Sequence, residues 1–500
     1  MGTGADAFAL ANQLPNSVYV IVAGGVLSSV FVPQIVKAQL NDDGGAAYIN
    51  RLLTLGMTVV LAVTVLAVAA APLLVRLYTQ HTTDGSGSGF GPDELWLATA
   101  FAWWCLPQVF FYALYSLVGE VLNAKGLFGP FTWSPVLNNI VAILGMLWFG
   151  AQFTGDVAVA SDWDGTEIAI LAGTATLGVV LQSLALYGFL GRAGIRFRPD
   201  FRFRGVGLGT ATKLAAWTFG MIIVTQIAGV VQSNIASLAT TYGEPGLAVL
   251  RFGWLVFMLP HSVITVSMGT AYFTRMSTHI RDSKWDRLGS DLSESLSRIS
   301  MFMVISAGVL WLTSAYVAGV FAEQTGSGME SVVALFAIGL VPFGISFVIQ
   351  RIFFALEDTR TPFLVQLAQS GIFVVGALWV GTGPVENIAD GIALSMSISI
   401  LFQSGVMALL LRRRLGFLGG RALALALLRF GAAVLPTLGV GLLIRDVLPE
   451  TGGSLLASMA FAALIGAGMG IVYLAVLLVL RDPSAKDLIA PLLRRGNKRP

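Results

Sequence analysis

The chain has 500 residues, of which 56% are hydrophobic and only 11% charged, whereas soluble globular proteins are about 25% charged. This composition excludes an ordinary soluble domain, and the formal net charge of +3 needs no nucleic-acid partner to explain it. With one cysteine, three scattered histidines (His81, His261 and His279) and no Gly-rich phosphate loop, the sequence indicates no internal disulfide, no metal or other cofactor, and no ATP hydrolysis by this chain.

Thirteen apolar stretches follow one another along the chain, and each is long enough to cross a bilayer, which requires about 20 residues. They cover residues 8–36, 52–76, 96–121, 131–153, 168–190, 212–240, 247–274, 298–321, 329–355, 362–382, 388–411, 422–444 and 455–480. The sequence therefore predicts an all-α polytopic membrane protein.

Positive charge alternates between the gaps that separate these stretches. Of the 30 Lys and Arg residues, 27 lie in every second gap or in the C-terminal tail, and the opposite gaps hold only Arg76 and Arg445. By the positive-inside rule the basic gaps and the C-terminus are cytoplasmic, where anionic membrane lipids are expected partners. Thirteen crossings then place Met1 outside, although no basic segment precedes the first stretch.

The two halves of the chain resemble each other in the order and spacing of short motifs. Pro15 precedes Gly24 by nine residues, as Pro260 precedes Gly269, and each proline follows a leucine. Farther along, residues 122–131 align with residues 354–363, and both segments end in Pro-Phe after a basic gap. The halves are therefore predicted to be parallel repeats, which favours a transporter whose two lobes rock around a central cavity to give alternating access.

This organisation predicts four parts. They are an N-terminal helical lobe at 1–200, a C-terminal helical lobe at 201–415, a pair of last helices at 416–482 and a basic cytoplasmic tail at 483–500.

Arg251 is the sharpest candidate for a substrate contact. It lies early in an apolar stretch that carries no other charge until its cytoplasmic end. A charge placed deep in a bilayer costs at least about 2.5 kcal/mol, so the side chain is expected to face a cavity or a partner, and Arg can bind phosphate with two hydrogen bonds. The alternative is that Arg251 reaches the outer interface near Glu244, seven residues earlier.

Polar side chains in two other stretches could line the same cavity. Asp6 and the pair Asn12 and Asn16, which share a helix face, begin the first stretch, and Gln226 and Asn234 interrupt the sixth. Interhelical hydrogen bonds use the same residue types, so a purely structural role stays open for each of them. Glu120 lies five residues before Lys125, and this short separation favours a local ion pair between the two side chains.

Three groups of residues resemble motifs of the MurJ/MviN-type lipid II flippases, a branch of the multidrug/oligosaccharidyl-lipid/polysaccharide exporter superfamily. The first runs from Asp6-Ala7-Phe8 through Leu14-Pro15-Asn16 to Phe31-Val32-Pro33. The second is Asn123-Ala124-Lys125 with Pro130, and the third is Phe353-Phe354 with Asp358 and Thr361-Pro362. The resemblance covers nearly the whole chain in order.

The resemblance implies fourteen helices in two lobes of a bacterial plasma-membrane protein. It also implies that the substrate is lipid II, an undecaprenyl-pyrophosphate-linked peptidoglycan precursor, which is carried from the inner to the outer leaflet. Cell-wall synthesis proteins are a further partner class that it suggests. The family's last two helices form a groove for the lipid tail, which here corresponds to about 422–444 and 455–480.

Two departures from the family pattern affect these expectations. The family's first helix, with its arginines, has no counterpart, so we expect an earlier start that would restore a fourteenth span and a cytoplasmic N-terminus. The family's cavity arginine lies five residues before a proline, whereas Arg251 lies nine before Pro260. A shift of four residues is about one helical turn, which keeps the helix face and changes the depth.

The residues alone are also compatible with three other functions. One is export of another polyprenyl-linked glycan or of drug cations, although a drug exporter would be expected to carry carboxylates in its cavity. A second is a membrane glycosyltransferase or polymerase that uses Asp162, Asp164 or Glu167. A third is a scaffold for cell-wall enzymes that transports nothing.

Overall fold

The computed structural model describes residues 3–22, 46–78, 91–125, 127–153, 163–202, 211–242, 244–321, 328–416, 420–448 and 454–488. Within these ranges all regular secondary structure is helical. Eleven helices are long and apolar enough to cross a membrane, or twelve when the bent pair α14 and α15 counts as one span. The prediction of an all-α polytopic membrane protein is confirmed.

Several expectations fall wholly or partly outside the described residues. The first predicted span, 8–36, is described only as far as residue 22. The Gly/Ser-rich segment at 82–89, Asp162 and residues 489–500 of the basic tail also lie outside.

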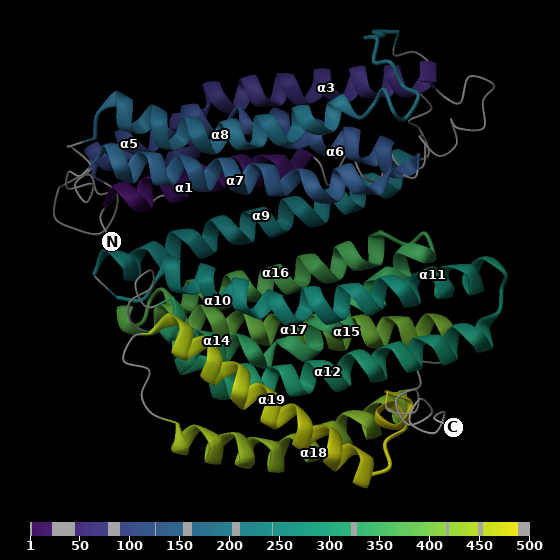
Figure 1. Cartoon of the computed structure of the whole chain (residues 1–500). Coiled ribbons are helices and arrows are strands. Elements are labelled where there is room, and N and C mark those ends of the chain that lie inside the picture. The colour runs from purple at the N-terminus through teal and green to yellow at the C-terminus, as the bar shows by residue number, and fades with distance from the viewer. Residues whose placement is uncertain are drawn as a thin grey trace, which may run out of the picture. The chain divides into compact units, whose positions relative to one another are not determined.

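The chain divides into two compact units, Met1–Asn234 and Ile235–Pro500. The predicted four-part division, with its first boundary at 200/201, stays a prediction. Figure 1 shows the helices of both units.

The first unit holds α1 (Thr3–Val22), α3 (Ala46–Ala69), α4 (Ala71–Tyr78), α5 (Pro92–Cys105), α6 (Gln108–Ala124), α7 (Phe128–Gln152), α8 (Gly165–Gly188) and most of α9 (Ala211–Thr241). Helix α7 packs along α8, α1 along α5, and α6 against both α3 and α8. Phe101 is fully buried between the rings of Phe8 and Trp163, at 5.3 and 5.2 Å between centroids. Aromatic packing therefore anchors α1 and the start of α8 on α5.

Pro107 divides one predicted span into α5 and α6. A proline cannot donate a backbone hydrogen bond, so the carbonyl groups of the preceding turn need other partners. Thr176 of α8 donates its hydroxyl to the carbonyl of Trp104 at 2.8 Å. Gln108, which is almost fully buried, donates in turn to the Thr176 hydroxyl at 2.9 Å. At the break in the helix, the Trp104 carbonyl thus accepts a hydrogen bond from a side chain of α8.

The second unit begins with α10 (Leu247–Pro260), a π-helical segment, η3 (His261–Val266), and α11 (Ser267–Arg281). It continues with α12 (Trp285–Val320), α14 (Met329–Ile338), α15 (Leu340–Ala355), α16 (Arg360–Val380), the short 3-10 helix η4 (Val385–Asn387), α17 (Ile388–Leu415), α18 (Gly420–Val447) and α19 (Leu455–Val479). The π-helical turns directly follow Pro260, where the ring of the proline perturbs the regular hydrogen-bond ladder.

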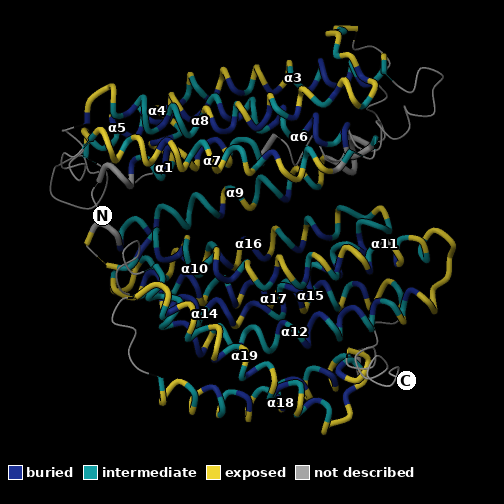
Figure 2. Tube along the Cα trace, in the orientation of Figure 1, coloured by how far each residue is buried: buried dark blue, intermediate teal, exposed yellow. Residues whose placement is uncertain are grey.

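Helix α12 is the centre of the second unit. It has 36 residues and packs against α11, α14, α15, α18 and α19. Figure 2 shows buried positions concentrated where α12, α14, α15 and α17 pass one another, while α18 and α19 expose much of their length. Leu428, Leu435 and Leu443 of α18 are each close to 70% exposed, which a soluble protein would avoid and a lipid-facing helix requires.

Candidate functional site

Arg251 is exposed on the second turn of α10, and it lies on the same helix face as the exposed Leu255 and Leu259. The opposite face carries Gly253, where α14 approaches so closely that an added Cβ would lie 2.9 Å from Val332. Among the described residues no ion pair reaches Arg251, and Glu244 is therefore not its partner. The positive N-terminal end of α10 and an unpaired guanidinium together make this a place that favours an anion.

One face of α1 presents the predicted polar residues. Asn12, Gln13 and Asn16 are exposed, whereas Leu14 and Pro15 between them are buried. The prediction that Asn12 and Asn16 share a face is therefore confirmed for this helix. Asp6 belongs to α1, but its side chain lies outside the described part of the chain.

The two polar residues of α9 bind neighbouring backbone. Gln226 donates to the carbonyl of Ser17 at 3.1 Å, next to Asn16, and Asn234 donates to the carbonyl of Leu77 at 3.2 Å. These bonds tie α9 to α1 and α4, which is the structural role that the sequence analysis left open. The structure thus brings Gln226 beside Asn16, attaches Asn234 to another helix, and places Arg251 in the other unit.

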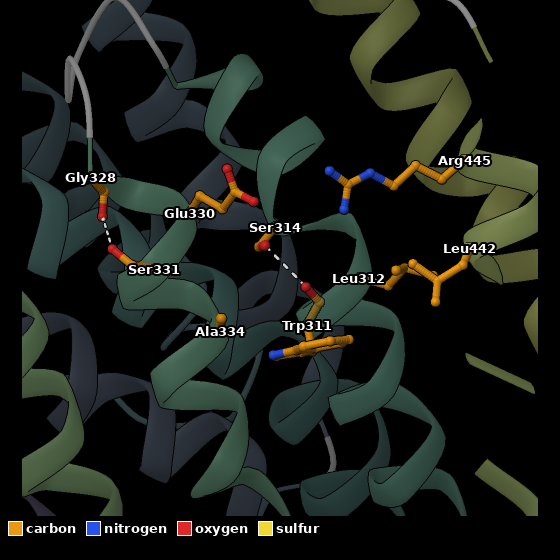
Figure 3. A pocket seen from close by; sticks show the side chains of 9 residues that line it. All are labelled: Trp311, Leu312, Ser314, Gly328, Glu330, Ser331, Ala334, Leu442 and Arg445. Atoms are coloured by element: carbon orange, nitrogen blue, oxygen red, sulfur yellow. Dashed lines mark hydrogen bonds between the residues drawn. The ribbon is translucent and has the colours of Figure 1, made fainter. Parts of the chain in front are cut away.

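A pocket that the sequence did not reveal lies in the second unit, with a volume of about 450 Å³ (Figure 3). Glu330 from α14 and Arg445 from α18 point into it, and Trp311 of α12 forms its floor. No ion pair joins the two charged groups in the described structure. Three helices that are far apart in the sequence build this pocket, so no local motif could have indicated it.

Asp358, a residue of the third motif, organises the start of α16. Its carboxylate accepts hydrogen bonds from the backbone nitrogen of Thr361 at 3.0 Å and from the Thr361 hydroxyl at 2.8 Å, and it pairs with Arg414. Partial burial opposes ionisation, but the bonds from Thr361 and Arg414 outweigh that effect and lower the pKa of Asp358 below its ordinary value. The motif thus fastens the end of α17 to the loop before α16.

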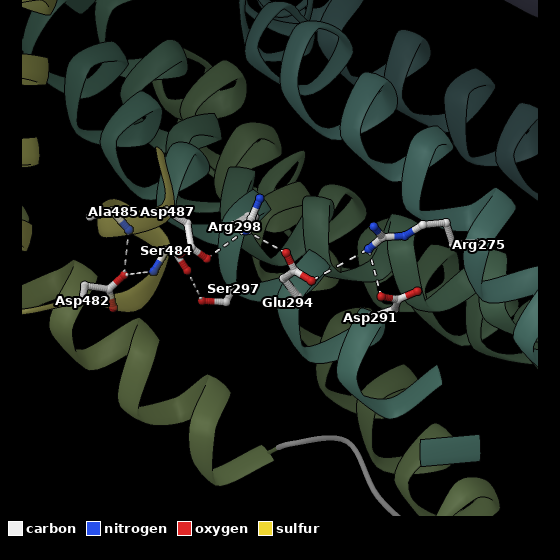
Figure 4. A network of polar contacts seen from close by, with 9 residues as sticks. All are labelled: Arg275, Asp291, Glu294, Ser297, Arg298, Asp482, Ser484, Ala485 and Asp487. Carbon is white, nitrogen blue, oxygen red and sulfur yellow. Dashed lines mark hydrogen bonds and ion pairs between the residues drawn. The ribbon is translucent and has the colours of Figure 1, made fainter. Parts of the chain in front are cut away.

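A second polar network joins α11, α12 and the segment after α19 (Figure 4). Arg275 pairs with Asp291 at 2.9 Å, and Arg298 pairs with Asp487 at 3.0 Å and with Glu294 at 2.7 Å. The buried Asp482 accepts from the backbone nitrogens of Ser484 and Ala485, which starts the short helix that ends the described chain. The network therefore holds residues 482–488 against α12.

The carboxylates that a membrane glycosyltransferase would need are partly committed to structure. Asp164 accepts hydrogen bonds at 2.8 Å from the backbone nitrogens of Thr166 and Glu167, and Glu167 accepts one from the backbone of Asp164 at 3.1 Å. This reciprocal pair is a capping box at the start of α8. Both side chains therefore have a role in the fold.

Comparison with known proteins agrees with this architecture. The family model described as lipid II flippase MurJ matches residues 1–463. A protein of Rhizobium tropici named "Probable lipid II flippase MurJ" is 27% identical over 80% of this chain and 73% of its own length. A protein of the same name from Haemophilus influenzae is 25% identical over 72% of this chain and 71% of its own length.

Solved structures share the fold at low sequence identity. A lipid II flippase MurJ in an inward closed conformation superposes with a TM-score of 0.70 at 18% identity, covering 96% of this chain and 94% of its own. An inward-facing multidrug resistance MATE family transporter of the MOP superfamily superposes with a TM-score of 0.62 at 14% identity, covering 83% and 91%. Because the family model extends over more than nine tenths of the sequence, the chain belongs to the lipid II flippase MurJ family.

Proposed function

We propose that this chain moves lipid II from the inner to the outer leaflet of the bacterial plasma membrane by alternating access. The observation that carries the proposal is the match of the family model to residues 1–463, since it spans all the helices from α1 into α19. Curated relatives named as probable lipid II flippases support it, because this chain covers more than two thirds of their length.

Arg251 is the residue that we expect to bind the pyrophosphate of the lipid. The Arg251 guanidinium is exposed, lies close to a helix N-terminus and has no carboxylate partner among the described residues, which suits a doubly charged phosphate group better than a cation. The planar fork of Arg can donate two parallel hydrogen bonds to phosphate oxygens, which Lys cannot do.

The polar residues of the first unit are proposed to contact the glycan or peptide of the substrate. Asn12 and Asn16 are exposed and offer both donors and acceptors, as a sugar requires. The amide nitrogens of Gln226 and Asn234 bind backbone carbonyls, and the Gln226 side chain is proposed to present its carbonyl oxygen to the ligand, with Asn234 lining the same cavity. Asp6 is proposed to lie at the outer gate.

The topology that we propose follows from the distribution of positive charge. The basic gaps and the C-terminus would be cytoplasmic, and anionic lipids would contact their arginines. Transport rather than catalysis is the activity of the family. The capping box of Asp164 and Glu167 counts against a polymerase, because their oxygens accept helix-starting hydrogen bonds.

The test is complementation in a bacterium depleted of its own lipid II flippases, followed by an assay of lipid II accessibility on the outer surface. The wild-type chain is expected to restore both growth and accessibility. Unchanged accessibility, with the protein present in the membrane, would sink the proposal. Accessibility of a different polyprenyl-linked glycan instead would assign the chain to that substrate.

Arg251→Ala is expected to lower the transport rate about 30-fold or more, which corresponds to the roughly 2 kcal/mol lost when one partner of a hydrogen-bonded charge pair is removed. Arg251→Lys should lie between wild type and Arg251→Ala, because it keeps the charge but loses the second hydrogen bond. Arg287→Ala, at an exposed arginine in the first turn of α12, is the matched control. A scaffold protein would be indifferent to all three substitutions.

A further inference from the structure

Helix α6 carries a row of polar residues at intervals of four: Gln108, Tyr112, Ser116 and Glu120. Residues four apart in an α-helix lie above one another on the same face, so the row extends about 18 Å along α6. Most of the remaining residues of α6 are apolar, and its core face is buried through Ala113, Leu117, Val118 and Val121. A polar row in such a helix is costly unless its members bind one another or a ligand.

Two members of the row are connected. Tyr112 donates its hydroxyl to the side-chain carbonyl of Gln108 at 3.3 Å, and Gln108 donates to Thr176 at 2.9 Å. Tyr19 of α1 lies beside the row, with its ring centroid 5.7 Å from that of Tyr112, and packs against the core cluster that contains Leu117 and Val121. Hydrogen bonds therefore join the first two members of the row to the Pro107 break, and Ser116 and Glu120 continue the row on the same face of α6.

Glu120 ends the row as a partly buried carboxylate that has no positive partner among the described residues. The expected ion pair with Lys125 is absent, because residues five apart point to different sides of a helix. A partly buried carboxylate that lacks a positive neighbour is costly when ionised, and binding a proton removes that cost.

Among the described residues, the other helices and segments packed against α6 do not pair a positive charge with Glu120. Helix α7 has no titratable residue, α1 offers Tyr19, and α3 offers Tyr48 and Arg51, whose guanidinium pairs with Asp200 at 3.5 Å. Helix α8 carries Glu167, which belongs to the capping box at its start, and Tyr187. In the segment that follows α8, Arg202 pairs with Asp200, Arg192 stacks on Phe189, and Arg196 and Arg198 are exposed.

We propose that Glu120 is a proton-binding site through which this chain couples transport to the proton gradient, with Ser116, one helical turn before it on α6, as a positioning residue. One proton binds the carboxylate, changes its charge from −1 to zero and leaves on the opposite side in each cycle. A metal ion fits less well, because the described residues contain no group of three His, Cys, Asp or Glu side chains that could hold one. The coupling part of this inference rests on the proposed function, whereas the proton site does not.

The proton site is tested on the purified full-length chain by infrared difference spectroscopy between acidic and basic pH. The wild type is expected to show a protonated carboxyl band that Glu120→Gln lacks. The matched control is Glu386→Gln, an exposed carboxylate in η4, which should retain the band. A band unchanged in Glu120→Gln would overturn the proposal. Ser116→Ala should shift the frequency of the band without removing it, because only the hydroxyl one helical turn from the carboxyl changes.

Coupling is tested in vesicles that contain the chain and fluorescent lipid II, with the membrane potential held at zero. For one proton per lipid, the steady-state ratio of lipid between leaflets should change about tenfold for each unit of pH difference. Glu120→Gln should abolish this change and Glu386→Gln should preserve it; a change that persists in Glu120→Gln overturns coupling at this residue. If Glu120→Gln fails only with lipid whose peptide has a free amine, the carboxylate binds substrate and the proposal is wrong. If the wild type moves no lipid, the proposed function fails while the infrared result still decides the proton site.

Discussion

The sequence alignment of the two predicted repeats pairs α6 with α15, yet the two helices carry different side chains at the paired positions. The alignment of residues 122–131 with 354–363 pairs the row Gln108, Tyr112, Ser116 and Glu120 with Leu340, Gly344, Val348 and Ile352. All four residues of α15 are buried, and none is charged or carries a polar side chain. A helix paired with α6 in the sequence alignment therefore folds without a polar row. Folding alone does not explain the row in α6.

Helix α15 carries a positive charge at the position directly before Ile352, the residue that the alignment pairs with Glu120. Arg351 lies over the rings of Phe347 and Phe273, at 4.5 and 5.5 Å from their centroids, and within the described chain no carboxylate pairs with it. Its sequence equivalent in α6 is Gly119. Among the described residues, α6 thus carries an acid without an ion-pair partner and α15 carries a base without one. Such asymmetry between repeats is expected where the two halves perform different steps.

Introducing a glutamate into α15, at the position that the alignment pairs with Glu120, should have the largest effect on the free energy of unfolding. Ile352 is fully buried, so Ile352→Glu would leave an unpaired charge in the core and should lower the free energy of unfolding by at least about 3 kcal/mol. The reciprocal change, Glu120→Leu, should not lower stability, because it removes a partly buried charge without a partner. Thermal unfolding in detergent measures both. Equal destabilisation by the two variants would show that the polar row serves the fold.

A smaller effect is expected at Gly119, the counterpart of Arg351. A Cβ at this position would lie 2.3 Å from the ring of Phe131, which stacks on Tyr115. Gly119→Ala should therefore destabilise the first unit by about 1–3 kcal/mol, the usual range for overpacking. Gly371→Ala is the control, because nothing lies within 4 Å of its added Cβ and the exchange should stabilise α16 by about 0.5–1 kcal/mol. The unfolding midpoints of the two variants should thus move in opposite directions.

The smallest expected effect concerns the loop after α15. Because the pKa of Asp358 is lower in the folded chain than in the unfolded chain, its contribution to stability is present at neutral pH and lost as the pH falls through the folded-state value. Asp358→Asn should remove that part of the acid sensitivity and lower the thermal midpoint slightly at pH 7. The sequence-equivalent residue in the first repeat is Gly126, which has no side chain to titrate. Identical pH profiles for wild type and Asp358→Asn would contradict the assigned role.

Much of the fold could be predicted from the sequence, because apolar length and alternating positive charge depend on the chain alone. The predicted span 298–321 proved to be only part of α12, which starts at Trp285, since its first four turns are polar and lie beyond the apolar signal. The π-helical turns after Pro260 were not predicted, because a proline within an apolar stretch indicates a perturbed helix but does not specify how the hydrogen-bond ladder continues. Pro107 was a visible break signal in a stretch that we had treated as continuous.

The candidate site was less predictable, and the reasons differ between residues. The shared face of Asn12 and Asn16 follows from helical spacing and is confirmed. Gln226 and Asn234 look the same in sequence whether they face a ligand or a neighbouring backbone, and only the structure reveals the carbonyl groups that they bind. The row that ends at Glu120 has a sequence signal, because its polar residues recur every four positions, but the nearby Lys125 favoured a local ion pair instead. The roles of Arg251 and Asp6 stay predictions.

The length of α12 has a consequence for where its ends lie. At 1.5 Å per residue its 36 residues measure about 54 Å, well beyond the roughly 30 Å of a hydrocarbon core. Its polar first turns therefore extend into water, where Asp291 pairs with Arg275 and Arg298 pairs with Asp487, while α18 and α19 pack along the helix. One continuous helix thus joins the polar contacts of the last described segment to the membrane-spanning part of the second unit.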